Sequence, residues 1–158
     1  MNVEHLLDVF TSIDANSEGV WDACRDFVSH LHWHKPRLVT LGPKIEGLPD
    51  DHSSKPQCLL GRSLLFDSVG NDTESVRLLI CALELWRERE DDFRIAEALR
   101  FLSQANGQLD LYREGIRQAK EALEIYERLN HIIGQAQCWR RLAQLLFDDE
   151  LQKKPHTK

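Results

Sequence analysis

The sequence predicts an all-α fold, in which antiparallel helix pairs stack into a right-handed superhelical solenoid. Segment 73–89 aligns without a gap with segment 113–129, and segment 96–111 aligns with segment 136–151, each at a shift of 40 residues. Within each unit the apolar residues recur at steps of three and four, which places them on one stripe of a helix. A fixed period of about 20 to 50 residues is typical of stacked repeats, because one amphipathic pair cannot bury its apolar stripe alone.

The order of the elements follows from these segments and from the breakers between them. Turn-forming or capping residues cluster near 16–19, 48–54, 69–72 and 91–92. Pro36 and Pro56 suit the first turn of a helix, where the missing N–H has no partner in any case. We expect helices near 3–12, 20–31, 36–47, 56–68, 73–89, 94–108, 112–128 and 133–147. The expected organisation is an N-terminal helix and loop over 1–18, a repeat domain over 19–151 whose last unit is incomplete, and a polar tail over 152–158.

Composition narrows the class of protein. The chain has 158 residues, of which 42% are hydrophobic, and this is enough for a folded core of moderate size. Its formal net charge of -6 disfavours binding to nucleic acid, which requires clustered Lys and Arg to neutralise phosphates. The first residues lack the pattern of a signal peptide, and no apolar run reaches membrane-spanning length. The cysteines are widely spread, which argues against structural zinc and a disulfide framework. We therefore expect a cytoplasmic protein that binds neither membrane nor nucleic acid.

The spacing of large and small residues resembles a known motif, the tetratricopeptide repeat. Its first helix carries a large residue, then Leu, a small residue and a bulky one, and Trp139-x-x-Leu142-Ala143-x-x-Leu146 has all of these. Arg62 departs from the pattern, since the family has Leu there. Either that helix is rotated or buries the charge against a partner, or its packing stripe is shifted so that Arg62 remains exposed. The resemblance implies a concave surface on which such proteins bind other proteins.

The resemblance extends to a narrower family. Segments 33–46, 83–88 and 121–129 are similar to the C-terminal repeat arrays of fungal NACHT-type signalling ATPases, over roughly residues 20–151. In that family the repeats are thought to sense or hold a ligand while a separate ATPase domain oligomerises. The phosphate-binding loop of such a domain, Gly-x-x-x-x-Gly-Lys-Ser/Thr, does not occur in this sequence. The resemblance therefore implies an isolated sensor or adaptor.

A peptide-binding groove is the first candidate site. Arg100 and Arg140 stand 40 residues apart, and each is followed four residues later by a glutamine, Gln104 or Gln144, on the same helical face. Guanidinium groups there would hold the carboxylates of an acidic or C-terminal peptide, and the glutamines would pair with its backbone. Apolar contacts are expected from Leu60, Leu64 and Phe101. The alternative is that these polar residues form an ordinary solvated face.

Self-association is the second candidate function. The last predicted helix has no following partner helix in the sequence, so its apolar residues are expected to have one uncovered side. The expected contact residues are Trp139, Leu142, Leu145 and Leu146. Docking of this helix onto a second copy or onto a parent receptor would cover them.

An enzyme is the least favoured class, and we expect no cofactor, metal or catalytic residue. His30, His32 and His34 contain metal-ligand side chains, but only the first and last of them share a helical face. Gly-x-Ser-x-Gly and His-Glu-x-x-His motifs are missing from the sequence. Cys58 and Cys138 occupy like positions in their repeats, so we expect buried, unreactive thiols there and an exposed Cys81.

Overall fold

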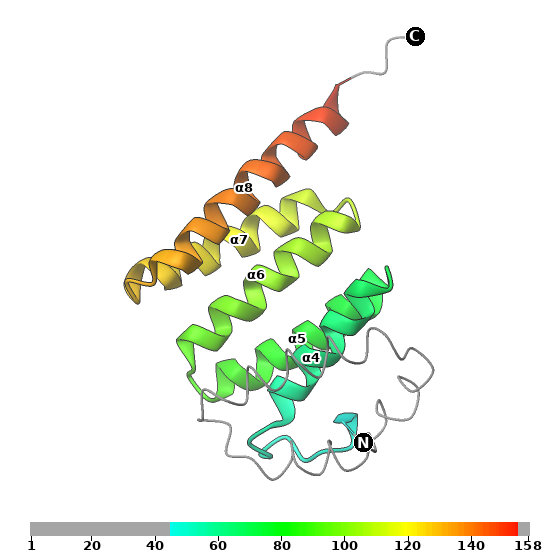
Figure 1. Cartoon of the computed structure of the whole chain (residues 1–158), viewed down its shortest axis with the longest axis vertical. Coiled ribbons are helices and arrows are strands. Elements are labelled where there is room, and N and C mark those ends of the chain that lie inside the picture. Colours follow the sequence, from blue (N-terminus) through cyan, green and yellow to red (C-terminus); the bar gives the residue numbers. More distant parts are fainter. Residues whose placement is uncertain (1–44, 155–158) are drawn as a thin grey trace. The chain divides into compact units, whose positions relative to one another are not determined.

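The computed structural model of this chain describes residues 45–154 (Figure 1). This part contains the helices α4 (Lys55–Ser68), α5 (Asp72–Glu88), α6 (Asp92–Gln108), α7 (Tyr112–Arg128) and α8 (Ile132–Lys153), and between Ile45 and Lys154 there is no strand. The predicted all-α class is confirmed. The chain divides into two compact units, Met1–Leu85 and Trp86–Lys158, with the boundary inside α5.

The helix boundaries agree with the sequence prediction to within about two residues, except at the end of α8. The sequence predicts an end near 147, whereas α8 continues to Lys153 and takes in the first residues of the predicted polar tail. Of the helix expected over 36–47, only residues 45–47 are described; Ile45 and Glu46 are helical and Gly47 is in a turn. The helices expected over 3–12 and 20–31, and the N-terminal element over 1–18, lie outside the described residues.

In the first unit, α4 has a proline in its first turn and buries most of its first two turns. Pro56 stands in the first turn, where a missing N–H leaves no hydrogen bond unmade. The buried residues of α4 are Pro56, Gln57, Cys58, Leu59, Leu60, Ser63 and Leu65. The turn into α5 passes through Gly70, whose φ of 78° is a conformation that glycine adopts without steric cost. This turn lets α5 begin within four residues of the end of α4.

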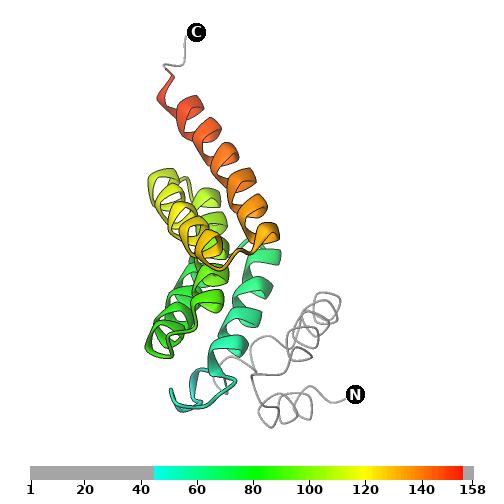
Figure 2. The ribbon, with the colours of Figure 1, turned by 90° about the vertical axis from the view of Figure 1, so that its left-hand side faces the viewer.

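In the second unit, α6 packs on α7, α7 packs on α8, and α6 also contacts α8 (Figures 1 and 2). The turns between these helices use Asp110 and Asn130 at φ 60° and 54°, a region that Asp and Asn tolerate better than most residues. Side chains cap two of the helices. Asp91 accepts a hydrogen bond from the backbone N–H of Arg94, and His131 accepts one from Gly134.

Burial in α7 follows burial in α5 at a separation of 40 residues. The buried residues of α5 from Leu78 onward are Leu78, Leu79, Ala82, Leu83, Leu85 and Trp86, and those at the same places in α7 are Gln118, Ala119, Ala122, Leu123, Ile125 and Tyr126. Ser75 and Gly115 are likewise buried in the first turn of each helix. The two helices therefore bury the same stripe.

Candidate functional site

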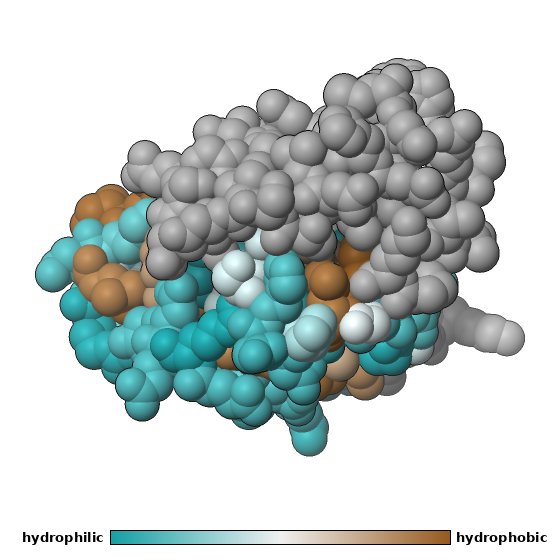
Figure 3. Space-filling model, turned by 90° about the horizontal axis from the view of Figure 1, so that it is seen from below, coloured by the Kyte–Doolittle hydropathy of each residue, from teal (hydrophilic) through white to brown (hydrophobic). Residues whose placement is uncertain are grey.

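One side of α8 is apolar and exposed. Trp139 is 59% exposed, Leu146 49% and Phe147 61%, although side chains of this size are usually at least partly covered in folded proteins. At about 100° per residue these side chains lie on one stripe of the helix. We call this stripe the α8 face, and it consists of Ile132, Ala136, Trp139, Ala143, Leu146 and Phe147, all of them exposed. On the face of the molecule shown in Figure 3, the residues coloured by hydropathy are mostly hydrophilic, with a few apolar areas among them.

The opposite side of α8 is buried against the other helices of the second unit. Its buried residues are Gly134, Cys138, Leu142 and Leu145. A Cβ atom at Gly107 of α6 would lie 2.6 Å from Leu145 Cδ2, and one at Gly115 of α7 would lie 3.3 Å from Leu145 Cδ1. The two glycines thus make room for Leu145. The helix is therefore apolar on both sides, with one side covered.

The predicted self-association residues divide between these two sides. Trp139 and Leu146 are exposed, as the sequence predicts, whereas Leu142 and Leu145 are only 4% and 2% exposed. The expectation that all of them have an uncovered side is corrected for Leu142 and Leu145, because they lie on the side that packs on the preceding helices. Ile132 and Phe147, which the sequence analysis did not select, belong to the exposed side.

The side of α6 that corresponds to the α8 face is covered by α7. Leu99, Ser103 and Asn106 stand 40 residues before Trp139, Ala143 and Leu146, and all three are buried. A Cβ atom at Gly115 of α7 would lie only 2.9 Å from the Ser103 carbonyl oxygen. The amide of Asn106 donates a hydrogen bond of 2.8 Å to Gln118 Oε1, also on α7. The middle of this stripe is thus buried in α6, whereas the equivalent residues Trp139, Ala143 and Leu146 are exposed in α8.

The predicted polar groove residues lie on α6 and α8 but are engaged in different ways. Arg100 is half-buried, and its guanidinium carbon lies 4.3 Å from the centre of the Phe101 ring. Gln104 accepts a hydrogen bond of 2.9 Å from Arg141 Nη2. Gln144 is exposed and donates to Asp148, and Arg140 is exposed next to the α8 face. A groove formed by these side chains together stays a prediction.

The apolar residues expected to line the groove differ in exposure. Leu60 is completely buried, so it offers no surface to a ligand and that prediction is corrected. Leu60 belongs to a run of consecutive buried residues in the first two turns of α4. Leu64 and Phe101 are half-buried. Leu64 belongs to the first unit and Phe101 to the second.

A buried ion pair lies on α6. Arg94 Nη1 and Glu97 Oε2 are 3.0 Å apart, and their side chains are only 13% and 16% exposed. Burial raises the pKa of the Glu97 carboxyl, and the neighbouring Arg94 opposes that rise. Nearby, burial raises the pKa of Tyr126 to about 12 and that of the Cys138 thiol to about 11. Neither group is suited to act as a nucleophile or base at neutral pH.

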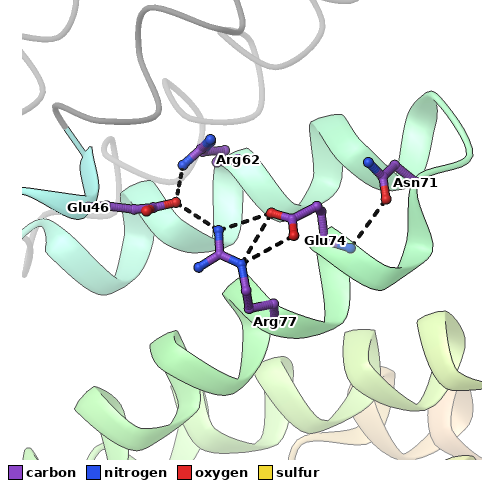
Figure 4. Close-up of polar contacts among 5 residues, drawn as sticks. All are labelled: Glu46, Arg62, Asn71, Glu74 and Arg77. Carbon is purple, nitrogen blue, oxygen red and sulfur yellow. Dashed lines mark hydrogen bonds and ion pairs between the residues drawn. The ribbon is translucent and has the colours of Figure 1, made fainter.

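The first unit carries a charged network that involves Arg62 (Figure 4). Glu46 accepts hydrogen bonds from Arg62 of α4 and Arg77 of α5, and Arg77 also pairs with Glu74. The Arg62 side chain is 13% exposed and lies over the Phe66 ring, 5.4 Å from its centre. Its charge is therefore partly buried and is paired with a carboxylate of the same chain.

Between residues 45 and 154 no group of His, Cys, Asp and Glu side chains is placed to hold a metal ion. None of the helices in this range combines the length and apolar character needed to cross a bilayer. Cys24 and the histidines at 30, 32 and 34 lie outside the described residues.

The chain matches no protein-family model and no curated protein sequence.

Proposed function

We propose that this chain is a protein-interaction module of the tetratricopeptide type, and that the α8 face is its binding surface. The observation that carries the proposal is a helix with two apolar sides, of which only one is buried. Removing apolar surface from water is favourable by roughly 25 cal/mol per Å². A contiguous apolar stripe that remains exposed is therefore typical of a surface that another protein covers.

The repeated burial pattern supports the repeat-module part of the proposal. Equivalent residues of α5 and α7 are buried at a separation of 40 residues, and the same separation relates buried residues of α6 to those of α8, such as Leu102 and Leu142. Stacked helical repeats characteristically use one extended surface for binding. A role as the sensor or adaptor of a signalling system is part of this proposal and rests on the sequence resemblance.

A double variant, Trp139→Gln with Phe147→Gln, tests the binding surface. Proteins that are recovered from native extract with the wild-type chain should be lost with this variant. Ile80→Gln is the matched control, because Ile80 is an exposed apolar residue of α5, 43% exposed, outside the α8 face. Equal recovery with all three chains would contradict the proposed surface.

The polar residues of α6 and α8 provide a second candidate surface. Arg100 Nε is buried without a hydrogen-bond partner, and Arg140 is exposed beside the α8 face. Charge reversal, Arg100→Glu with Arg140→Glu, separates the two surfaces. If it removes a partner that the α8 double variant retains, the polar residues form the binding site. If it leaves binding unchanged, the peptide-groove assignment is wrong.

Self-association through the α8 face is the alternative function, since a second copy would also cover these side chains. Light scattering over a range of protein concentrations measures it. An oligomer that dissociates when Trp139 and Phe147 are replaced would establish this alternative. A monomer at high concentration would count against it.

A further inference from the structure

We propose that the α8 face binds an antiparallel amphipathic helix that packs on it as α7 packs on α6. This inference rests on the proposed function and names the chemistry of the partner. The chain itself provides the template, because Leu99, Ser103 and Asn106 are buried in α6, whereas their equivalents in α8 are exposed. Helices that lay an apolar stripe on a partner surface are a common mode of protein recognition.

The first requirement on the partner concerns its distance from α8. Over α6, the α7 backbone comes so close that a Cβ atom at Gly115 would lie 2.9 Å from the Ser103 carbonyl oxygen. Ala143 takes the place of Ser103 in α8, and its side chain is no larger. A partner helix can therefore approach α8 as closely, provided that it carries Gly or another small residue at the place of Gly115.

The second requirement concerns polarity. Asn106 and Gln118 form a buried hydrogen bond between α6 and α7. Leu146 takes the place of Asn106 in α8 and has no group that donates or accepts a hydrogen bond. The amide nitrogen of Gln118 donates to Glu114 of its own helix, but its Oε1 atom would find no donor on Leu146, which is unfavourable for a buried oxygen. We therefore expect an apolar residue on the partner helix at the place of Gln118.

The pattern of small residues favours an α7-like helix over a second copy of α8. In α7, the small buried residues Gly115, Ala119 and Ala122 follow one another at steps of four and three. In the α8 face, the small residues Ala136 and Ala143 are separated by Trp139, which is large. Two α8 helices therefore do not present to each other the continuous small stripe that α7 presents to α6.

A peptide derived from this chain is a suitable probe. A labelled peptide with the sequence of residues 111–130 and the change Gln118→Leu should bind the full chain in fluorescence anisotropy. The unchanged peptide should bind roughly tenfold more weakly or worse, because the Oε1 atom of its glutamine is buried against Leu146 without a donor. A peptide with Gly115→Leu in addition should not bind, because the close approach is blocked. Equal helicity of the peptides is checked by circular dichroism.

The variant Leu146→Asn makes the test specific to the α8 face. It recreates the Asn106–Gln118 pairing, so the chain should now prefer the unchanged peptide over the Gln118→Leu peptide. Leu146 is exposed, and the variant is expected to fold as the wild type does. A preference that does not change with Leu146→Asn would overturn the inference, because the peptides would then bind elsewhere.

Failure of the inference and failure of the proposed function give different results. If neither peptide binds but the α8 double variant still loses its protein partner or breaks up an oligomer, the surface is correct and the occupant is wrong. An oligomer would identify a second copy as the occupant. If the double variant also behaves as the wild type in every assay, the proposed function itself is wrong.

Discussion

Gly134 lies where the first turn of α8 meets the ring of Tyr126. A Cβ atom at this position would lie 2.5 Å from Tyr126 Cδ1, closer than van der Waals contact permits. The ring has little room to move, since Tyr126 is 1% exposed and stacks on His131 with ring centres 5.2 Å apart. The glycine is therefore required by packing.

We expect Gly134→Ala to destabilise the protein by about 1–3 kcal/mol, as overpacking of a core typically does. Helix propensity alone predicts the opposite sign, because Ala in a helix is favoured over Gly by roughly 1 kcal/mol. Urea denaturation measures the free energy of unfolding, with Lys120→Ala on the exposed side of α7 as control. If Gly134→Ala stabilises the protein instead, the ring of Tyr126 must move to make room for the added methyl group.

Glu97 gives the folded state a pH dependence of definite sign. Because burial raises the pKa of this carboxyl in the folded protein, the folded state binds its proton more tightly than the unfolded state. The contribution of Glu97 to stability is therefore fully present below the unfolded pKa of about 4.3 and is lost as the pH rises through the folded pKa. The variant Glu97→Gln removes this dependence.

The free energy of unfolding of Glu97→Gln relative to the wild type should therefore increase as the pH rises through the acidic range. Urea denaturation at a series of pH values measures this difference, and subtraction of the wild-type curve removes the titration of the other carboxyls. A difference that decreases with rising pH would mean that the pair with Arg94 outweighs burial in setting the pKa.

Single residues also show how far sequence reasoning reaches. The buried state of Cys58 and Cys138 is confirmed, because it follows from their places in the repeated apolar pattern. Cys81, expected to be exposed, is of intermediate burial. The environment of Arg62 could not be predicted, since its partner Glu46 is sixteen residues away and no local pattern connects the two. Periodicity predicts which residues are buried, but the pairing of charges depends on which elements become neighbours.

At the scale of the element, α8 is the helix that differs most from its prediction. The run Asp148-Asp149-Glu150 suggests a hydrated helix end, but in the structure it continues the helix. Lys153 pairs with Asp149 and Glu150 at the i,i+4 and i,i+3 spacings, which support a helix, and Gln144 donates to Asp148. The spacing of apolar residues in α8 did not indicate which of them face the preceding helices.

The orientation of α8 buries Leu145 and leaves its neighbour Leu146 exposed. Leu145 is 2% exposed and lies against Gly107 and Gly115, so Leu145→Ala should destabilise the protein by about 2–5 kcal/mol. Leu146→Ala, one residue later on the exposed side, should change stability by no more than about 0.5 kcal/mol. Urea denaturation of the two variants compares them directly. Similar losses for both would mean that the α8 face is covered in solution.

At the scale of the whole molecule, the fold class and the order of the described helices follow from the 40-residue period. The stacking of helix pairs into a right-handed solenoid and the resemblance to tetratricopeptide repeats stay predictions. The candidate site was predicted in part. Trp139 and Leu146 are exposed, as predicted. The groove of Arg100, Gln104, Arg140 and Gln144 stays a prediction.

The packing of the second unit predicts a gradient of stability along the chain. The helix α7 contacts both α6 and α8, so its backbone amides should exchange hydrogen slowly. The end of α8 extends past α6 and α7 in both views (Figures 1 and 2), and after Leu145 it has no buried residue up to Lys153. Amides over 146–153 should therefore exchange much faster than those over 112–128.

Hydrogen exchange followed by mass spectrometry measures both segments in one experiment, with α7 as the internal reference. Equal protection of 146–153 and 112–128 would contradict the gradient, and dilution would then show whether self-association is the cause. Addition of the Gln118→Leu peptide should slow exchange in α8, because a bound helix suppresses local opening. Slowing by the peptide that is larger over 139–147 than over 148–153 would place the bound helix on the α8 face.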